Sequence, residues 1–328
     1  IRDSVASRGL GDVYKRQGFI GSNLVSSLLS NNKNIQLTVF DNLTSGSLDF
    51  FNKDIINTIN FIRGDIKDLD SLNSHINGHD CIIHLAANPD VSGAIEKPDI
   101  DFWEGTYLTQ NILEAMRTNN ISNLIYTSGS GVYGEKVDEN FNESFGPCLP
   151  ISTYGASKLA CESLMSAYCH MYDFKIRALR FANVVGPQQT HGVGFDFLRR
   201  LRSDNTRLDI LGDGKQTKSY IHILDVISAI NLMLEQLYLP TSNNYDVFNV
   251  ASNDYLSVNK IAEMVCATLN LNKENVLFEY TGGERGWKGD VPNIKFDCSK
   301  IKSLGWEPKF SSEKAMAESL KSMLTEIT

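Results

Sequence analysis

Short apolar runs that finish on small or polar residues are the feature that most constrains the fold of this chain. Residues 81–87 (CIIHLAA) and 124–128 (LIYTS) form such runs, and 35–40 is a short apolar run that leads into Asp41. Residues 61–66 and 174–181 are also interpreted as strands, although they carry charged residues. A continuous apolar run is typical of a strand buried on both faces of a parallel sheet. Because helical-looking stretches separate the runs, the sequence predicts an α/β fold with a doubly wound parallel sheet.

The length and composition limit the class of protein. With 328 residues, the chain suits one large α/β unit with a smaller companion. Its formal net charge of -8 opposes binding to nucleic acid or to an anionic membrane surface. There is no run of about 18 apolar residues and no signal-peptide pattern, so we expect neither a membrane span nor secretion, and a cytoplasmic location. The six cysteines lack CxxC spacing, so we expect reduced thiols and no metal site.

Tyr154 and Lys158 are the strongest candidates for chemistry. They lie four residues apart in a helical-looking stretch, 154–168, and therefore on one helix face. A phenol with a pKa of about 10 is a poor base at neutral pH, but a lysine cation one turn away stabilises the phenolate and lowers that pKa. Such a tyrosine can exchange a proton with a hydroxyl group. A tyrosine packed on a lysine stem gives the same spacing, so the pair needs support from other motifs.

Several motifs surround this pair in order along the chain. They are GFIG at 18–21, DNL at 41–43, HLAA at 84–87, VYG at 132–134 and RFAN at 180–183. Together with the Tyr–Lys pair they resemble the extended short-chain dehydrogenase/reductase family, in particular its NAD-dependent nucleotide-sugar epimerases of the UDP-glucose 4-epimerase type. The resemblance runs from about residue 18 to the C-terminus. It implies a Rossmann-like doubly wound parallel sheet with a smaller C-terminal α/β substrate lobe, and NAD as the cofactor.

The glycines and the first acidic residue indicate how the cofactor binds. Gly18 and Gly21 match the last two glycines of a GxxGxxG turn, which delivers a pyrophosphate to a helix N-terminus. Asp41 follows about 20 residues later, where a carboxylate bonds the adenosine ribose and repels a 2′-phosphate, so NAD is favoured over NADP. A plain turn is the alternative at each of these positions. The resemblance implies further cofactor contacts from Phe19, Ile20, Asn42, Asp65, Ile66, Leu85, Ala86, Ala87, Tyr154 and Lys158.

The N-terminal segment departs most from the family pattern. Lys15 stands at the first glycine position, and residues 1–17 carry charges where an apolar first strand is expected. We interpret residues 1–17 as a damaged or non-native segment, such as a translated cloning or sequencing scar that replaces the true strand. Loss of a central strand would also leave the chain poorly folded.

The resemblance also sets approximate domain limits. Beyond residues 1–17, it implies a NAD-binding Rossmann domain at 18–184 and about 222–250. The nucleotide-sugar-binding lobe would then comprise about 185–221 and 251–328.

For catalysis, the resemblance implies that Tyr154, as a phenolate, takes the proton of a sugar hydroxyl while the ring hydride passes to NAD. Lys158 lowers the tyrosine pKa and holds the nicotinamide ribose. If the resulting keto-sugar turns over and the hydride returns to its other face, the product is the epimer.

The loop after residues 124–128 bears on the type of reaction. The family's hydroxyl-bearing residue falls on Gly129, so Ser128 or Ser130 would supply that hydroxyl, and Ser128 is the first choice. Ser130 and Gly131 also stand where the sugar 4,6-dehydratases carry an Asp-Glu pair. They cannot perform acid/base chemistry of that kind.

For the substrate, the resemblance implies a nucleotide-sugar, with a UDP-hexose favoured. It assigns Asn183 to the diphosphate and places Lys218, with Tyr220 close by, where the family has an arginine. Arg285 lies in a glycine-rich loop and suits bidentate phosphate binding, although it is two residues from the family position.

Other conspicuous residues are expected to have structural roles. His84, His222 and Asp225 are interpreted as core or capping residues. Gly105 and Leu108 replace the asparagine and glycine that are usual in the family's cofactor-facing helix, so packing near the nicotinamide is expected to differ.

Two alternatives stay open. A nucleotide-sugar reductase or decarboxylase of the same family would use the same Tyr–Lys pair. The departures at Lys15, Gly105 and Gly129 also fit a NAD-binding homologue with little turnover. By analogy with the family, helices at 103–117 and 154–168 would form a homodimer.

The interpretation of residues 1–17 can be tested on the gene. We expect an independent source of the gene to encode a different, apolar segment there. Recovery of the same codons from intact genomic DNA would refute the interpretation.

Overall fold

The chain forms two compact units whose segments alternate along the sequence. The structure, a computed structural model, describes residues 4–8, 18–31, 34–44, 48, 51, 53–136, 140–240 and 243–326. Unit 1 comprises Ile1–Val132, Cys148–Arg180 and Ile227–Phe248. Unit 2 comprises Tyr133–Pro147, Phe181–Val226 and Asn249–Thr328.

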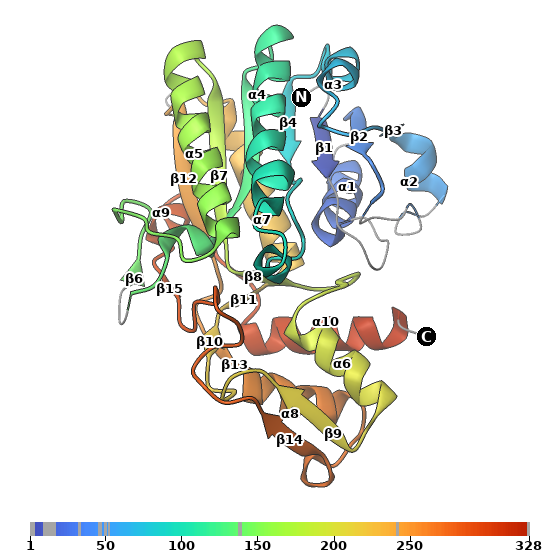
Figure 1. Ribbon diagram of the computed structural model, residues 1–328. Coiled ribbons are helices and arrows are strands. Elements are labelled where there is room, and N and C mark those ends of the chain that lie inside the picture. The colour runs from blue at the N-terminus through green and yellow to red at the C-terminus, as the bar shows by residue number, and fades with distance from the viewer. Residues whose placement is uncertain are drawn as a thin grey trace. The chain divides into compact units, whose positions relative to one another are not determined.

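Unit 1 is built on a seven-stranded sheet with the order β12-β7-β5-β4-β1-β2-β3 (Figure 1). The strands are β1 Ser4–Arg8, β2 Leu37–Asp41, β3 Asn60–Arg63, β4 Cys81–His84, β5 Asn123–Gly129, β7 Lys175–Phe181 and β12 Tyr245–Val250. The pairings from β3 through β2, β1 and β4 to β5 are all parallel. The order reverses between β1 and β4, as it does in doubly wound sheets, so the predicted fold class is confirmed.

The central strand β1 lies in the segment that the sequence analysis interpreted as non-native. Its backbone pairs with both neighbours, Ser4 lying opposite Leu37 of β2 and Cys81 of β4. Ladder hydrogen bonds come from backbone groups, which every residue except proline supplies. Apolar periodicity therefore gave no signal for this strand. Lys15 lies outside the described residues, and the origin of residues 1–17 stays a prediction.

Helices cover both faces of the sheet. Those that begin in unit 1 are α1 Phe19–Asn31, α2 Lys53–Thr58, α3 Leu69–Ile76, α4 Tyr107–Thr118 and α5 Thr153–Tyr172, with short helices at Ser92–Ile95 (η2), Phe102–Thr106 (η3) and Ser130–Tyr133 (η4). Helix α7 (Ile223–Leu237) crosses from unit 2 into unit 1. The neighbouring helices α4 and α5 (Figure 1) bury Ile112 and Met165 in the core that contains Ile82 of β4. Cys81 and Ile83, which point to the opposite face, are buried too. Burial on both faces explains why the strand sequences are continuously apolar.

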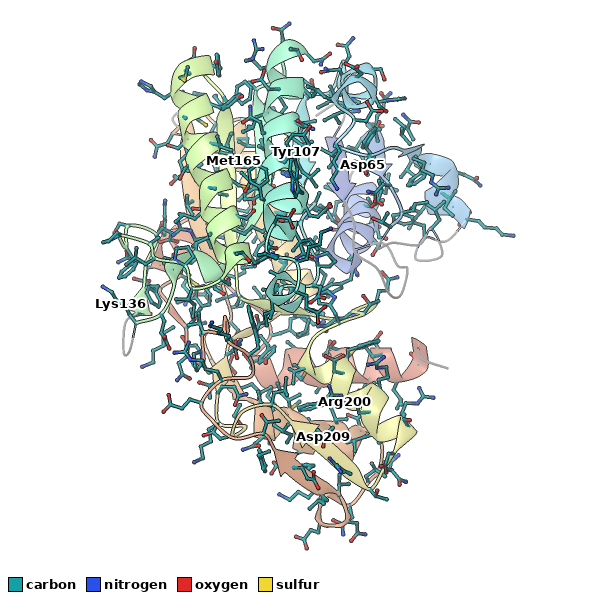
Figure 2. All side chains as sticks on the ribbon, in the orientation of Figure 1. Asp65, Tyr107, Lys136, Met165, Arg200 and Asp209 are labelled. Atoms are coloured by element: carbon teal, nitrogen blue, oxygen red, sulfur yellow. The ribbon has the colours of Figure 1, made fainter. Side chains whose placement is uncertain are left out.

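Unit 2 is a smaller α/β unit with its own core. Its strands are β6 Asn140–Phe141, β8 Asn183–Val185, β9 Arg207–Ile210, β10 Thr217–Lys218, β11 Tyr220–His222, β13 Leu256–Ser257, β14 Leu277–Tyr280 and β15 Lys295–Phe296. Its helices are α6 Val193–Ser203, α8 Val258–Thr268, η5 Lys273–Asn275, α9 Ser299–Lys302 and α10 Ser312–Glu326. Leu198, Ile261 and Met316 bring α6, α8 and α10 into one core. Arg200 of α6 also donates to the carbonyl of Asp209 on β9 at 3.1 Å, and Figure 2 labels both residues.

The segment Tyr133–Pro147 belongs to unit 2, whereas the sequence analysis placed it in the first domain. Its strand β6 pairs in parallel with β15, Asn140 lying opposite Lys295. A two-residue strand carries too little periodicity to reveal such a pairing.

Two further observations concern the described residues as a set. All six cysteines are free thiols. In the described part of the chain, no helix has the length and apolar character to cross a membrane, and no cluster of His, Cys, Asp or Glu could hold a metal ion.

His222 and Asp225 fix the start of α7, which confirms their predicted structural role. The Asp225 carboxylate accepts hydrogen bonds from the backbone N–H groups of Lys309 at 2.9 Å and Phe310 at 3.2 Å. The His222 ring stacks on Phe310 with ring centroids 4.1 Å apart. Burial raises the pKa of the Asp225 carboxyl group, and the two backbone bonds act in the opposite direction.

Replacing this carboxylate should destabilise the protein. Asp225→Ala leaves two backbone N–H groups without their acceptor, and we expect a loss of about 2 kcal/mol or more in the free energy of unfolding. Urea denaturation measures this loss. Glu235→Ala, at an exposed position of the same helix, is the matched control and should change the value by less than about 0.5 kcal/mol. Equal effects of the two substitutions would contradict the bonding described here.

Candidate active site

Helix α5 carries the Tyr–Lys pair. The helix begins after Ser152, whose hydroxyl accepts a hydrogen bond from the Gly155 N–H at 3.1 Å, an ordinary N-cap. Tyr154 and Lys158 lie one turn apart, and the Lys158 Nζ is 5.6 Å from the centroid of the Tyr154 ring. The structure therefore brings the pair together as the spacing predicts.

Lys158 is held in a buried position. Its side chain is 4% exposed, and its Nζ donates to the backbone carbonyl of Thr127, at the carboxyl end of β5, at 2.7 Å. The same Nζ lies 4.8 Å from the centroid of the Tyr126 ring. A buried ammonium group requires such partners. The cation is thus fixed beside the Tyr154 ring.

A close contact between glycines brings the loop after β5 onto α5. A Cβ atom on Gly155 would lie 2.3 Å from the carbonyl oxygen of Gly131 and 2.8 Å from its carbonyl carbon. These are backbone atoms, so a larger residue at 155 would force the two segments apart. The contact places the loop containing Ser130 next to the helical turn that carries Tyr154.

Ser128 is engaged elsewhere. Its hydroxyl is buried and donates to Glu162 Oε1 at 2.6 Å. Arg180 Nε and Nη2 donate to the same carboxylate at 3.0 and 2.6 Å. A hydroxyl has one hydrogen to donate, so Ser128 cannot give it to a substrate while it serves Glu162. Ser130, in η4, is partly exposed.

Glu162 and Arg180 were not among the predicted site residues. Glu162 lies four residues beyond Lys158, so Tyr154, Lys158 and Glu162 occupy successive turns of one helix face. Arg180 is the first residue of the RFAN motif. The helical spacing of Glu162 and the motif that contains Arg180 are both visible in the sequence. The ion pair between the two residues is not, because they are 18 residues apart and meet only where α5 packs on β7.

The predicted ribose-binding carboxylate lies at the carboxyl edge of the sheet. Asp41 ends β2, is 6% exposed, and accepts a hydrogen bond from the Leu43 N–H at 2.7 Å. Next to it, Asn42 Nδ2 donates to Asp65 Oδ2 at 3.2 Å, just beyond β3. Figure 2 labels Asp65 in unit 1. The structure thus brings Asp41, Asn42 and Asp65 together.

The glycine segment meets the end of β4. Gly18 accepts a hydrogen bond from the Ser22 N–H at 3.2 Å in the first turn of α1. A Cβ atom on Gly21 would lie 3.4 Å from the Leu85 side chain. The side chains of Phe19, Ile66 and Ala86 are buried, whereas Ile20, Leu85 and Ala87 are partly exposed. These residues fit a dinucleotide. The carboxylate at the end of β2 can accept hydrogen bonds, and the N-terminus of α1, which follows Gly18, can donate them beside small residues.

Gly105 allows a π-helical turn to approach α5. It lies in η3, and a Cβ atom there would be 2.4 Å from the Ser157 hydroxyl oxygen. That hydroxyl donates to the Asp101 carbonyl at 2.7 Å. Leu108 is buried in the core of unit 1. These contacts give a packing reason for both departures from the family's helix.

His84 is a structural residue, as predicted. It is fully buried, and its Nε2 lies 3.0 Å from the Thr109 hydroxyl. Burial, and to a smaller extent the nearby Lys158 cation, lower its pKa to about 3, so the imidazole is neutral at physiological pH.

In unit 2, two of the predicted substrate residues, Lys218 and Arg285, contact Asp290. Asn183 of β8 lies opposite Tyr220 of β11. Tyr220 is buried, which raises its pKa. Lys218 forms an ion pair with the buried Asp290, which also accepts from the Gly286 N–H at 3.2 Å.

Arg285 completes this cluster. Its Nη1 donates to the Asp290 carbonyl at 3.2 Å, and its Nη2 donates to both carboxylate oxygens of Glu135 at 2.7 and 2.6 Å. Glu135 lines a cavity of about 570 Å³ in unit 2. The other lining residues include Lys136, Lys215, Gln216, Glu284 and Lys295. The sequence analysis missed the role of Glu135, which is 150 residues from its partner.

Comparisons with known proteins bear on this arrangement. A family model described as the NAD-dependent epimerase/dehydratase family matches residues 16–251. A Methanocaldococcus jannaschii protein provisionally named UDP-glucose 4-epimerase is 33% identical over 304 residues, covering 89% of this chain and 91% of that protein. The dTDP-D-glucose 4,6-dehydratase of Bos taurus is 27% identical over 312 residues, covering 94% of this chain and 86% of that protein. The solved structure of the Thermotoga maritima UDP-glucose 4-epimerase with UDP-glucose has a TM-score of 0.84 at 27% identity, covering 99% of this chain and all of that one.

The contact between Gly155 and Gly131 can be tested by substitution. Alanine is a better helix former than glycine by about 1 kcal/mol, but overpacking against a backbone carbonyl costs about 1–3 kcal/mol. We therefore expect Gly155→Ala to lose about 1–2 kcal/mol in the free energy of unfolding, measured by chemical denaturation. The matched control is Gly129→Ala, because among the described residues no heavy atom would lie within 4 Å of the new methyl group. A variant Gly155→Ala as stable as the wild type would show that this contact is not tight.

Proposed function

This chain belongs to the NAD-dependent epimerase/dehydratase family, and on that basis we propose that it is an epimerase of nucleotide-sugars, similar to UDP-glucose 4-epimerase. The observation that carries the proposal is the Tyr154 phenol beside a fixed, buried lysine cation. The adjacent Gly155 packs against a loop that has no carboxylate between Gly129 and Gly134.

The cofactor is NAD. Asp41 would bond the adenosine ribose, and Gly18 and Gly21 would admit the pyrophosphate to the first turn of α1. Lys158 would reach the nicotinamide ribose. When bound, NAD accepts a hydride from the sugar carbon and returns it.

Tyr154 acts as the acid and base in the proposed reaction. As a phenolate it takes the proton of the sugar hydroxyl, and the carbon that carried this hydroxyl becomes a ketone. Lys158 keeps its positive charge throughout and stabilises the phenolate. Tyr154 then returns the proton to the oxygen after the keto-sugar has turned over, so the configuration at that carbon is inverted and no cofactor is consumed.

Ser130 is the better candidate for the hydroxyl that bonds the reacting sugar oxygen. Ser128, the first choice from the sequence, donates to Glu162. Ser130 is partly exposed, in the loop that touches α5 at Gly155. This assignment is part of the proposal.

The loop composition favours an epimerase over a dehydratase. Elimination of water from a sugar requires groups that move protons at neighbouring carbons. Ser130 and Gly131 provide no such acid or base. Overall similarity does not distinguish the two reactions, because a dehydratase among the relatives also matches most of the chain. The preference for an epimerase therefore rests on the loop alone.

The nucleotide would be bound by unit 2. Asn183, Lys218, Tyr220 and Arg285 supply an amide, a phenol and two cations, a set that suits a diphosphate and its sugar. A solved relative contains UDP-glucose, which supports a UDP-hexose as the substrate. A cytoplasmic location and a homodimer remain parts of this proposal.

The decisive experiment is an NMR assay with added NAD and a panel of UDP-, GDP- and dTDP-hexoses. We expect one sugar to be converted to its epimer by the wild type, and Tyr154→Phe to lower the rate at least about 100-fold because it removes the acid/base group. Tyr168→Phe, on the same helix but bonded to Glu114, is the matched control and should retain activity.

Other outcomes distinguish the alternatives. Accumulation of NADH would indicate net oxidation of the sugar, which is the reverse of a reductase reaction. Release of carbon dioxide from an added UDP-hexuronic acid, which carries the necessary carboxyl group, would indicate a decarboxylase. Binding of NAD without conversion of any sugar would indicate a binding homologue.

A further inference from the structure

Arg285 is held in place by its own loop, which leaves one face of its guanidinium group for an outside partner. Asp290 accepts from the Gly286 N–H and is ion-paired with Lys218, so the loop is closed on a buried carboxylate. Arg285 Nη1 bonds the Asp290 carbonyl. Its Nη2 points away from these contacts, to Glu135 on a different segment.

Glu135 occupies this face in the manner of an anionic ligand. Both of its carboxylate oxygens lie within hydrogen-bond distance of the one nitrogen, Arg285 Nη2. The side chains of Arg285 and Glu135 are 36% and 35% exposed. Pairs this exposed to water contribute little to stability, so a stronger anion can separate them.

The charges of the cluster show which carboxylate would move. Two cations, Arg285 and Lys218, pair with two carboxylates, Glu135 and Asp290, so the charges of these four residues cancel. These four residues attract a diphosphate only when one of the two carboxylates leaves. Asp290 is 6% exposed and bonded to Gly286 and Lys218, whereas Glu135 is partly exposed. Glu135 is therefore the one to be displaced.

From this geometry we propose that Glu135 is an internal competitor of the nucleotide. Its carboxylate occupies the phosphate-binding face of Arg285 in the ligand-free protein, and a nucleoside diphosphate displaces it into the adjoining cavity of about 570 Å³. Release of Glu135 restores the net positive charge that a diphosphate requires. Glu135 thus selects for ligands with enough negative charge to take its place. This inference rests on the proposed nucleotide-binding role of Arg285.

Calorimetric titration of the full-length protein, with NAD added, tests the proposal. We expect Glu135→Gln to bind UDP or dTDP about 5-fold more tightly than the wild type, because the competing charge is gone. Affinity for uridine, which has no phosphate, should not change. Arg285→Ala should weaken binding of the diphosphate, and adding Glu135→Gln to it should have no further effect, since the two residues act through one pair.

Glu284→Gln is the matched control. Glu284 is exposed, lines the same cavity and adjoins Arg285 in sequence, so its substitution changes the net charge equally. We expect it to change the affinity for UDP less than 2-fold, about 0.4 kcal/mol. An equal gain in UDP affinity from Glu284→Gln would show that the effect comes from the change in net charge alone. This result would overturn the proposal.

Two further outcomes would also overturn it. In the first, Glu135→Gln binds UDP or dTDP no more tightly than the wild type does. In the second, no variant binds UDP or dTDP. Failure of the proposed function gives a different result. Tighter binding of UDP or dTDP by Glu135→Gln without conversion of any sugar would support the displacement of Glu135 and reject the proposed epimerase activity. Epimerisation by the wild type with an unchanged affinity of Glu135→Gln would support the activity and reject the displacement.

Discussion

The hydrogen bond from Lys158 to the carbonyl of Thr127 is the constraint on which the candidate site depends. A buried ammonium group must have a hydrogen-bond acceptor. The carbonyl of Thr127, near the carboxyl end of β5, is that acceptor. The bond fixes the first turns of α5 against the end of that strand. One turn further along, Glu162 receives Arg180 from β7. The face of α5 that carries Tyr154 is thereby attached to the neighbouring strands β5 and β7, so the sheet of unit 1 positions the phenol.

Glycines set the distances around this face. Gly155 lets the backbone of Gly131 come within contact of the helix, and Gly105 lets η3 come within contact of Ser157. In both places any side chain would overlap an atom already present. The contact at Gly105 lies beside Ser157, the residue before Lys158 in α5, whose hydroxyl donates to the Asp101 carbonyl.

Local patterns in the sequence predicted the α/β class, the apolar strands and the Tyr–Lys pair, because each depends on residues that are close together in the chain. The strand at Ser4–Arg8 was missed because its pairing relies on backbone groups and its sequence is not apolar. The contacts of Ser128 with Glu162 and of Arg285 with Glu135 were missed for another reason. They join segments 34 and 150 residues apart, and nothing in the periodicity of either segment specifies its partner. For the same reason the predicted domain limits differ from the two compact units at Tyr133–Pro147.

The open surroundings of Gly129 have a consequence for how such a site changes over generations. Among the described residues, none has a heavy atom within 4 Å of where a Cβ atom would stand, and the backbone there is not left-handed. Serine and glycine can therefore be exchanged at this position with little effect on folding. Folding therefore places little constraint on the choice between the two residues. Position 129 can gain a hydroxyl group without disturbing the packing around it, with Ser130 as a neighbouring source of the same chemistry.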